Sequence, residues 1–137
     1  MPHKPPLPVC KAFLVCRRVV DDRQKDDTIL EGLPRALHAY HYPCGALLGI
    51  FARCTSAHGN YQIEVQLHNQ AGEVVWRDGP EVPWLLGHPL EMYDLKMNYS
   101  VVFPAPGKFD IVLMANEEEV ARQRFEALVK QSSTASA

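Results

Sequence analysis

Three residues in one short stretch, His38, His41 and Cys44, have side chains that bind zinc in proteins. Two residues separate each from the next, and a fourth ligand would have to come from elsewhere, such as His88 or Cys54. Structural zinc sites usually show paired CxxC or HxxxH spacing, which this stretch lacks. We therefore expect a loop rich in His and Tyr, with no metal and no other cofactor. A metal-dependent hydrolase remains an alternative function.

The four cysteines of the chain are Cys10, Cys16, Cys44 and Cys54. A cysteine nucleophile needs a histidine close to it in space, and the sequence does not show which residues are neighbours. Cys16 stands in an apolar stretch, which indicates a buried and inert thiol. Cys10 and Cys16 are six residues apart, so on one strand they would point to the same side and lie too far apart to bridge. We expect four reduced thiols and no catalytic cysteine.

Carboxylates cluster at Asp21-Asp22, at Asp26-Asp27 and at Glu117–Glu119. A glycosidase needs two carboxyl groups held across a cleft. These runs lie in expected turns beside lysines and arginines, which is typical of solvated loops, and they lack the pattern of an EF-hand. No catalytic motif emerges, so we expect a non-catalytic protein.

The apolar triplet Trp84, Leu85 and Leu86 stands between Pro83 and Pro89, in a long connection where polar turn residues are the norm. An exposed triplet of this kind predicts an interface, with a protein partner or with a second copy of the chain. In the alternative arrangement the triplet covers an open end of the core. The tryptophans and tyrosines also leave open a module that binds carbohydrate or another small ligand.

A length of 137 residues indicates one domain, and the net charge of −2 gives no basic face for nucleic acid. The sequence has no signal-peptide pattern and no run of about 20 apolar residues, so we expect a cytoplasmic protein that does not associate with a membrane. The expected organisation is a flexible N-terminal segment 1–9, one domain at 10–130 and a disordered tail at 131–137.

Alternation of apolar and polar residues predicts strands, most clearly at Asn60–His68, where Tyr61, Ile63, Val65 and Leu67 share one side. The Asn116-Glu117 turn predicts a final hairpin in place of a helix. The other expected strands are Cys10–Val20, Thr28–Leu37, Leu47–Thr55, Glu73–Arg77, Glu91–Phe103, Lys108–Ala115 and Glu118–Val129, with Asp21–Asp27 as a charged loop. This pattern predicts an all-β chain, an immunoglobulin-like antiparallel β-sandwich of about eight strands.

Three segments carry a family resemblance: Ala12–Val19 (AFLVCRRV), Gly59–Val65 (GNYQIEV) and Phe103–Phe109 (FPAPGKF). In their order and spacing the chain resembles a bacterial family of small uncharacterised proteins, known as a domain of unknown function. The similarity covers residues 10 to 130. The resemblance implies a β-sandwich and a bacterial source, and it implies no activity.

Overall fold

The computed structural model describes residues 5–131, and within that range the chain forms strands and no helix. The all-β fold class is therefore confirmed. In chain order the strands are β1 (Val9–Cys16), β2 (Arg18–Asp22), β3 (Asp27–Glu31), β4 (Ala36–Ala39), β5 (Cys44–Thr55), β6 (Gly59–Tyr61), β7 (Ile63–His68), β8 (Val74–Asp78), β9 (Trp84–Leu86), β10 (Tyr93–Phe103), β11 (Gly107–Ala115) and β12 (Glu118–Val129).

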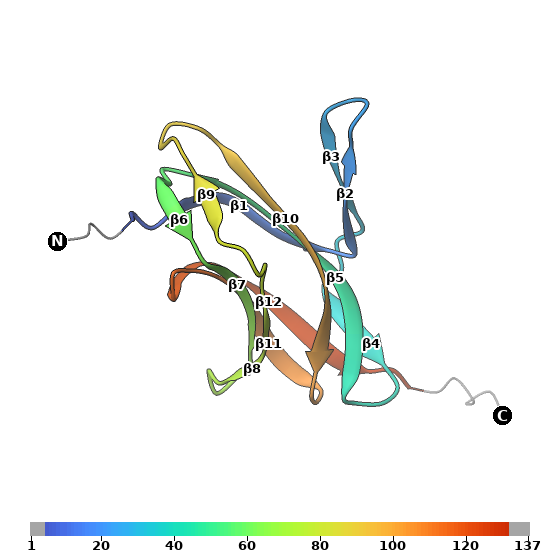
Figure 1. Cartoon of the computed structure of the whole chain (residues 1–137). Coiled ribbons are helices and arrows are strands. Elements are labelled where there is room, and N and C mark those ends of the chain that lie inside the picture. The colour runs from blue at the N-terminus through green and yellow to red at the C-terminus, as the bar shows by residue number, and fades with distance from the viewer. Residues whose placement is uncertain (1–4, 132–137) are drawn as a thin grey trace.

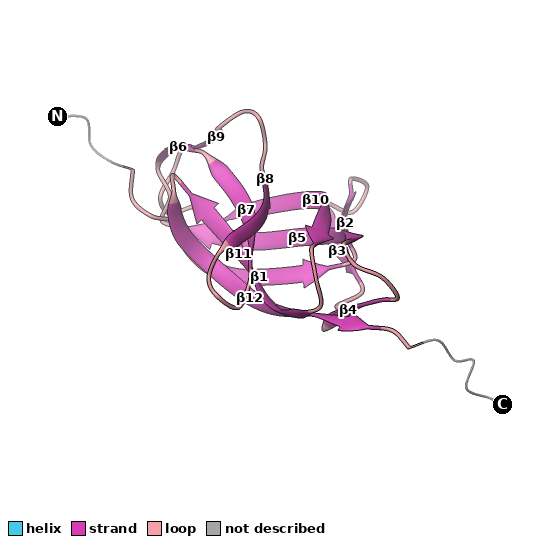
Figure 2. Cartoon of the chain, turned by 90° about the horizontal axis from the view of Figure 1, so that it is seen from below, coloured by secondary structure: helices cyan, strands magenta, loops and turns pink. Residues whose placement is uncertain are grey.

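Two sheets make up the body of the molecule (Figure 1). One has the strand order β1-β5-β10 and the other β4-β12-β11-β7-β8, which together give the eight strands expected from the sequence. Figure 2 shows the two layers facing each other. The chain crosses between the sheets several times, while β7-β8 and β11-β12 are pairs of consecutive strands within the larger sheet. The short β4 pairs in parallel with the last strand, β12. This order is that of an immunoglobulin-like sandwich.

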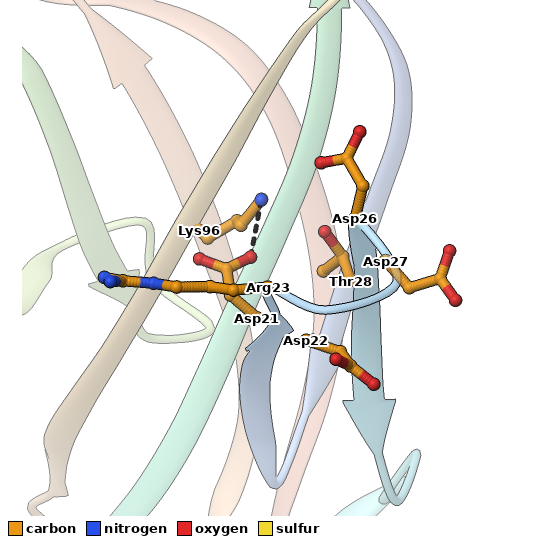
Figure 3. Close-up of a pocket in the computed structure, with 7 residues that line it drawn as sticks. All are labelled: Asp21, Asp22, Arg23, Asp26, Asp27, Thr28 and Lys96. Carbon is orange, nitrogen blue, oxygen red and sulfur yellow. Dashed lines mark hydrogen bonds and ion pairs between the residues drawn. The ribbon is translucent and has the colours of Figure 1, made fainter.

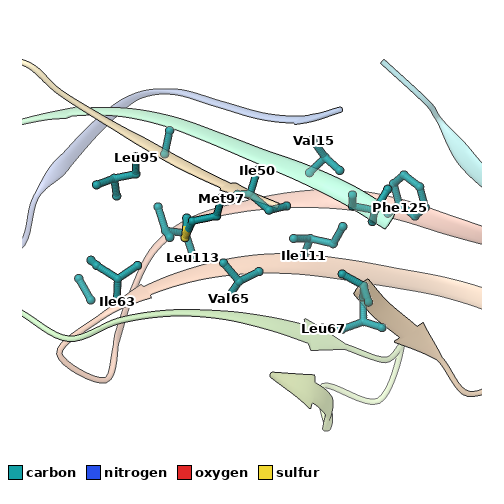
Figure 4. Packing of buried hydrophobic residues seen from close by; sticks show 14 of the residues in the cluster. Val15, Ile50, Ile63, Val65, Leu67, Leu95, Met97, Ile111, Leu113 and Phe125 are labelled. Atoms are coloured by element: carbon teal, nitrogen blue, oxygen red, sulfur yellow. The ribbon is translucent and has the colours of Figure 1, made fainter. Parts of the chain in front are cut away.

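The core lies between the inner faces of the sheets, and the period of two in the sequence places it there. On β7, Ile63, Val65 and Leu67 are almost completely buried, while the residues between them face outward. Across the sandwich they meet Ile50 and Leu95 of the three-stranded sheet (Figure 4). Because successive side chains of a strand point to opposite faces, this one pattern fixes which face is buried.

The final hairpin confirms that residues 118–129 form a strand although Glu and Ala favour helices. Asn116 and Glu117 both have positive φ, 50° and 68°, as a two-residue type I′ turn requires. The Asn116 side chain also accepts a 2.8 Å hydrogen bond from the Gln62 backbone N–H. The turn thus sets the first pairs of β11 with β12, before the register shifts between Leu113 and Met114, and it holds the hairpin against the neighbouring strand.

The first third of the chain differs from the expected strands. The segment Cys10–Val20 breaks into β1 and β2, and Thr28–Leu37 breaks into β3 and β4. The expected loop Asp21–Asp27 is the tip of a β2-β3 hairpin. The break occurs because the Arg17 backbone N–H bonds to the carbonyls of Glu31 and Gly32, at 2.9 and 3.0 Å, which turns the chain out of the sheet.

The β2-β3 hairpin packs on the outer face of the three-stranded sheet. Its Val19 is buried there with Cys16 and Phe51 in a small second cluster. The Asn98 amide of β10 joins the hairpin to the sheet, since its oxygen accepts from the Val19 N–H at 2.9 Å and its nitrogen donates to the Val19 carbonyl at 3.0 Å. One side chain thereby replaces a pair of backbone bonds between strands.

A β-bulge at Lys11 places Cys10 and Cys16 on opposite faces of β1, whereas the sequence predicted the same face. Cys10 pairs with Cys54, whereas the next paired residue is Ala12 opposite Arg53, so Lys11 is the extra residue of β1. One extra residue reverses which face the following side chains occupy. Cys10 therefore packs against the main core, and Cys16 lies in the outer cluster. The two do not share one side of the strand.

At the N-terminal end β1 begins at Val9, inside the segment expected to be flexible. The carbonyl of Pro6 accepts a 2.6 Å hydrogen bond from the hydroxyl of the buried Tyr61. Residues 1–4 of that segment, and residues 132–137 of the expected tail, lie outside the described residues.

For residues 5–131 there is no helix of the length and apolar character needed to span a membrane.

Candidate functional site

The triplet Trp84, Leu85 and Leu86 forms β9, a three-residue strand that pairs with β6. Since side chains alternate along a strand, Leu86 points inward and is 5% exposed, while Leu85 points outward and is 73% exposed. Trp84 is half-buried against the core. Two of the three predicted interface residues thus cover the end of the core, and one faces solvent.

The connection from β9 to β10 is held in place by hydrogen bonds to the end of β5. The Ser56 backbone N–H donates to the Pro89 carbonyl at 3.0 Å, and the Thr55 hydroxyl donates to the Glu91 carbonyl at 3.1 Å. The Tyr93 hydroxyl accepts from the His88 N–H at 2.8 Å. This loop is therefore fixed to the sandwich before any partner binds.

Large apolar side chains stand exposed on this end of the molecule, where β6, β9 and the loop before β10 lie together (Figure 1). We define the apolar loop surface as Val82, Leu85, Leu90 and Met92, which are 71%, 73%, 85% and 55% exposed. Val82 precedes β9, Leu85 lies on it, and Leu90 and Met92 follow it. Single exposed apolar residues are normal on a protein surface, whereas several close together in the sequence are less common.

Acidic residues flank the apolar loop surface. Glu81 precedes Val82 and Glu91 precedes Met92, and both carboxylates are exposed. Within the described part of the chain neither has an ion-pair partner. The nearby Asp94 is different, because Arg53 binds it with two hydrogen bonds of 2.8 and 3.0 Å. The end of the sandwich therefore combines exposed apolar side chains with exposed carboxylates.

The Arg53–Asp94 pair predicts a pH dependence of stability at this end. The Arg53 guanidinium hydrogen bonds lower the pKa of Asp94, so the pair stabilises the fold above the ordinary pKa of an aspartate, about 3.9. That contribution is lost as the pH falls through the lowered pKa. We expect Arg53→Gln to reduce stability at pH 7, and the difference from the parent to disappear in strong acid. Urea unfolding from pH 7 to pH 2 measures this; a difference that persists unchanged at pH 2 would contradict it.

The three residues with metal-like spacing extend from β4 to β5: His38 lies on β4, His41 in the connection and Cys44 at the start of β5. His38 and His41 are exposed, and Cys44 is half-buried at the start of β5. Its thiol donates to the Gly45 carbonyl at 3.5 Å. Within residues 5–131 no group of three or more His, Cys, Asp or Glu is placed to hold a metal ion.

The aspartates at the tip of the β2-β3 hairpin line a shallow hollow (Figure 3). Asp21 forms a 2.6 Å ion pair with Lys96, and Asp22 accepts hydrogen bonds from the backbone N–H groups of Gln24 and Lys25. The side chains of Asp26 and Asp27 point away from each other in Figure 3. These carboxylates form a solvated turn, as expected, and do not converge on one point.

The aromatic residues do not form an exposed row. Trp76 and Tyr99 make an edge contact with ring centroids 6.0 Å apart, and Tyr42, Trp84 and Tyr93 pack against the core. A carbohydrate-binding sandwich would need such rings stacked on an open face, so this arrangement does not favour that alternative.

A small-ligand module would instead use the groove between β1 and β12. Its walls include Leu14, Leu33 and Arg35, and its floor is formed by Val15 and Phe125. Both floor residues belong to the packed core, so the groove ends at the core surface. Binding pockets for small molecules bury most of their ligand, and this open groove does not provide that enclosure.

Sequence reasoning missed Val82, Leu90 and Met92 as members of the exposed surface. For Val82 and Leu90 the signal was present: the connection from Gly79 to Leu90 contains apolar residues without the alternation of a strand or the period of a helix. Apolar residues that follow neither the strand nor the helix pattern are not predicted to be buried in a core. Met92 fell inside the expected strand Glu91–Phe103, whereas β10 begins at Tyr93.

No protein-family model matches this sequence, and no curated protein matches it. Among solved structures the chain is similar to a Niemann-Pick type C2 protein from Japanese carpenter ant, with 10% sequence identity and a TM-score of 0.36. That similarity covers 93% of this chain and 96% of the other. At this identity and TM-score the similarity carries no inference about ligand or function. The strand order gives the fold class of this chain, an immunoglobulin-like β-sandwich, and the comparisons add no activity to it.

Proposed function

We propose that this chain is a non-catalytic domain that binds a partner protein through the apolar loop surface. The observation that carries the proposal is the exposure of Val82, Leu85, Leu90 and Met92 around β9, with Leu90 and Met92 on a loop fixed by hydrogen bonds. A surface ordered in advance loses less conformational entropy on binding, so more of the contact energy appears as affinity. A bacterial source and a cytoplasmic location remain predictions from the sequence.

The charge around the surface favours one kind of partner. Glu81 and Glu91 would lie at the rim of the contact, where a partner with basic residues around an apolar centre complements them. A symmetric contact between two copies would bring the same carboxylates together and add repulsion. The proposed partner is therefore a different protein, with an apolar surface rimmed by lysine or arginine.

The test compares matched leucine variants. Leu85→Ser with Leu90→Ser removes two residues of the apolar loop surface, whereas Leu47→Ser changes a leucine that is 78% exposed far from it on β5. Proteins from the source organism that bind the parent chain are purified and titrated by calorimetry. We expect Kd to rise by about tenfold or more for the double variant, as for loss of central interface residues, and to stay unchanged for Leu47→Ser.

Salt and self-association complete the test. With a basic partner rim, binding should weaken as sodium chloride is raised, because exposed charge pairs are screened. Sedimentation of the chain alone should show a monomer. The proposal fails if the double variant binds as tightly as the parent, and the choice of partner fails if the chain alone forms a dimer that the double variant lacks.

A further inference from the structure

Two cysteines from distant parts of the sequence face each other on the three-stranded sheet. Cys10 of β1 is the direct antiparallel partner of Cys54 of β5. Directly opposed residues point to the same face, and their Cα atoms lie about 4.5–5.5 Å apart. A disulfide needs a Cα separation of about 4.4–6.8 Å, so this pair has the spacing required without movement of the strands.

The paired thiols are neighbours on the inner face of the sheet, where both side chains pack at the main core. The Cys10 thiol donates to the Ala12 carbonyl at 3.1 Å. The other two cysteines have no such neighbour, since Cys16 bonds to the carbonyls of Arg18 and Gly49, and Cys44 to that of Gly45. In the described residues, the opposed pair is the place where two thiols meet.

The two thiols differ in their exposure to solvent, so they take different roles in oxidation. Cys10 is half-buried at the edge strand of the sheet, and Cys54 is 1% exposed within the core. Burial and the neighbouring Cys10 raise the pKa of Cys54 to about 12, so Cys54 keeps its proton at neutral pH until the step that forms the S–S bond removes it. An oxidant from solution therefore meets the Cys10 sulfur first, and Cys54 is held beside it as the second thiol.

We propose that Cys10 and Cys54 are a redox modification site that closes to a cross-strand disulfide when the protein meets hydrogen peroxide. The Cys10 thiolate attacks one peroxide oxygen, the O–O bond breaks, and the hydroxide released takes a proton to form water. This leaves Cys10 as a sulfenic acid. The Cys54 sulfur attacks the Cys10 sulfur, the S–S bond forms, the S–OH bond breaks, and the departing hydroxide takes the Cys54 proton. Two thiols are oxidised and one peroxide is reduced to two waters.

The test uses the native full chain, first reduced and then treated with hydrogen peroxide. Thiols counted after denaturation should fall from four to two per chain, and the intact mass should fall by two hydrogen atoms. Peptide mapping without reductant should show one linked pair, with Cys10 in one peptide and Cys54 in the other. Dithiothreitol should restore all four thiols.

Variants show whether the reaction with peroxide depends on the pairing of Cys10 with Cys54 or only on the exposure of a thiol. Cys44→Ser removes another half-buried thiol and should leave the link and the mass change intact. Cys10→Ser should abolish the link, and because Cys10 lies at a sheet edge this variant avoids the risk of unfolding carried by Cys54→Ala. The proposal is overturned if peroxide converts Cys10 to its sulfinic acid without the linked peptide, or if Cys10 and Cys44 of the parent react equally and form links between chains.

Discussion

Leu86→Ala is expected to lower the free energy of unfolding by about 2–5 kcal/mol, the range for removing a buried leucine side chain. Leu86 is 5% exposed and belongs to the main core, where β9 closes one end of the sandwich. Truncation would leave a cavity that the surrounding strands cannot fill. Urea denaturation followed by circular dichroism gives the change directly.

The neighbouring Leu85 is the matched control for that experiment. It has the same side chain on the same strand, but 73% of it is exposed, so Leu85→Ala should change stability by no more than about 0.5 kcal/mol. The two variants therefore separate residues that hold β9 in place from residues available to a partner. Equal losses of stability in the two variants would show that β9 is placed differently from this structure.

Gly49→Ala is the second large effect, with an expected loss of about 1–3 kcal/mol from overpacking. The backbone of β2 crosses directly over Gly49, so a Cβ there would lie 2.7 Å from the Val19 nitrogen and 2.8 Å from the Arg18 carbonyl carbon. Neither backbone atom can move without displacing the hairpin. We expect the β2-β3 hairpin to shift away from the sheet, exposing Phe51.

Gly45→Ala on the same strand is the control, because its Cβ would meet only the Ser100 hydroxyl at an ordinary 3.5 Å. Hydrogen exchange at residues 18–31, measured beside urea unfolding, reports the release of the hairpin. Unchanged exchange and stability in Gly49→Ala would contradict the close crossing of β2 over β5.

The fold class was predictable because its signal is local. Alternation at Ile63, Val65 and Leu67, and again along residues 93–103, depends only on which face of a strand is buried. The final hairpin could also be predicted from the sequence, since Asn116 and Glu117 form a turn that joins two adjacent strands.

The position of the first strands was not predictable, because residues far away decide it. The break at Arg17 depends on carbonyls of residues 31 and 32, and the bulge at Lys11 depends on the pairing of β1 with β5. The burial of Phe51 was unpredictable for the same reason. Alternation places Phe51 on the outer face of the sheet, where it would be exposed. The β2-β3 hairpin, which Asn98 joins to the sheet, covers it and leaves it 7% exposed.

By itself the sequence determined that this chain forms a β-sandwich and that Trp84–Leu86 is an apolar segment outside the regular pattern. Only the tertiary structure decided that Leu86 fills the core while Leu85 joins the exposed surface, and that Cys10 faces Cys54. The physical reason is that a residue's face on a strand follows from local alternation, whereas its partner follows from pairing between segments separated by tens of residues.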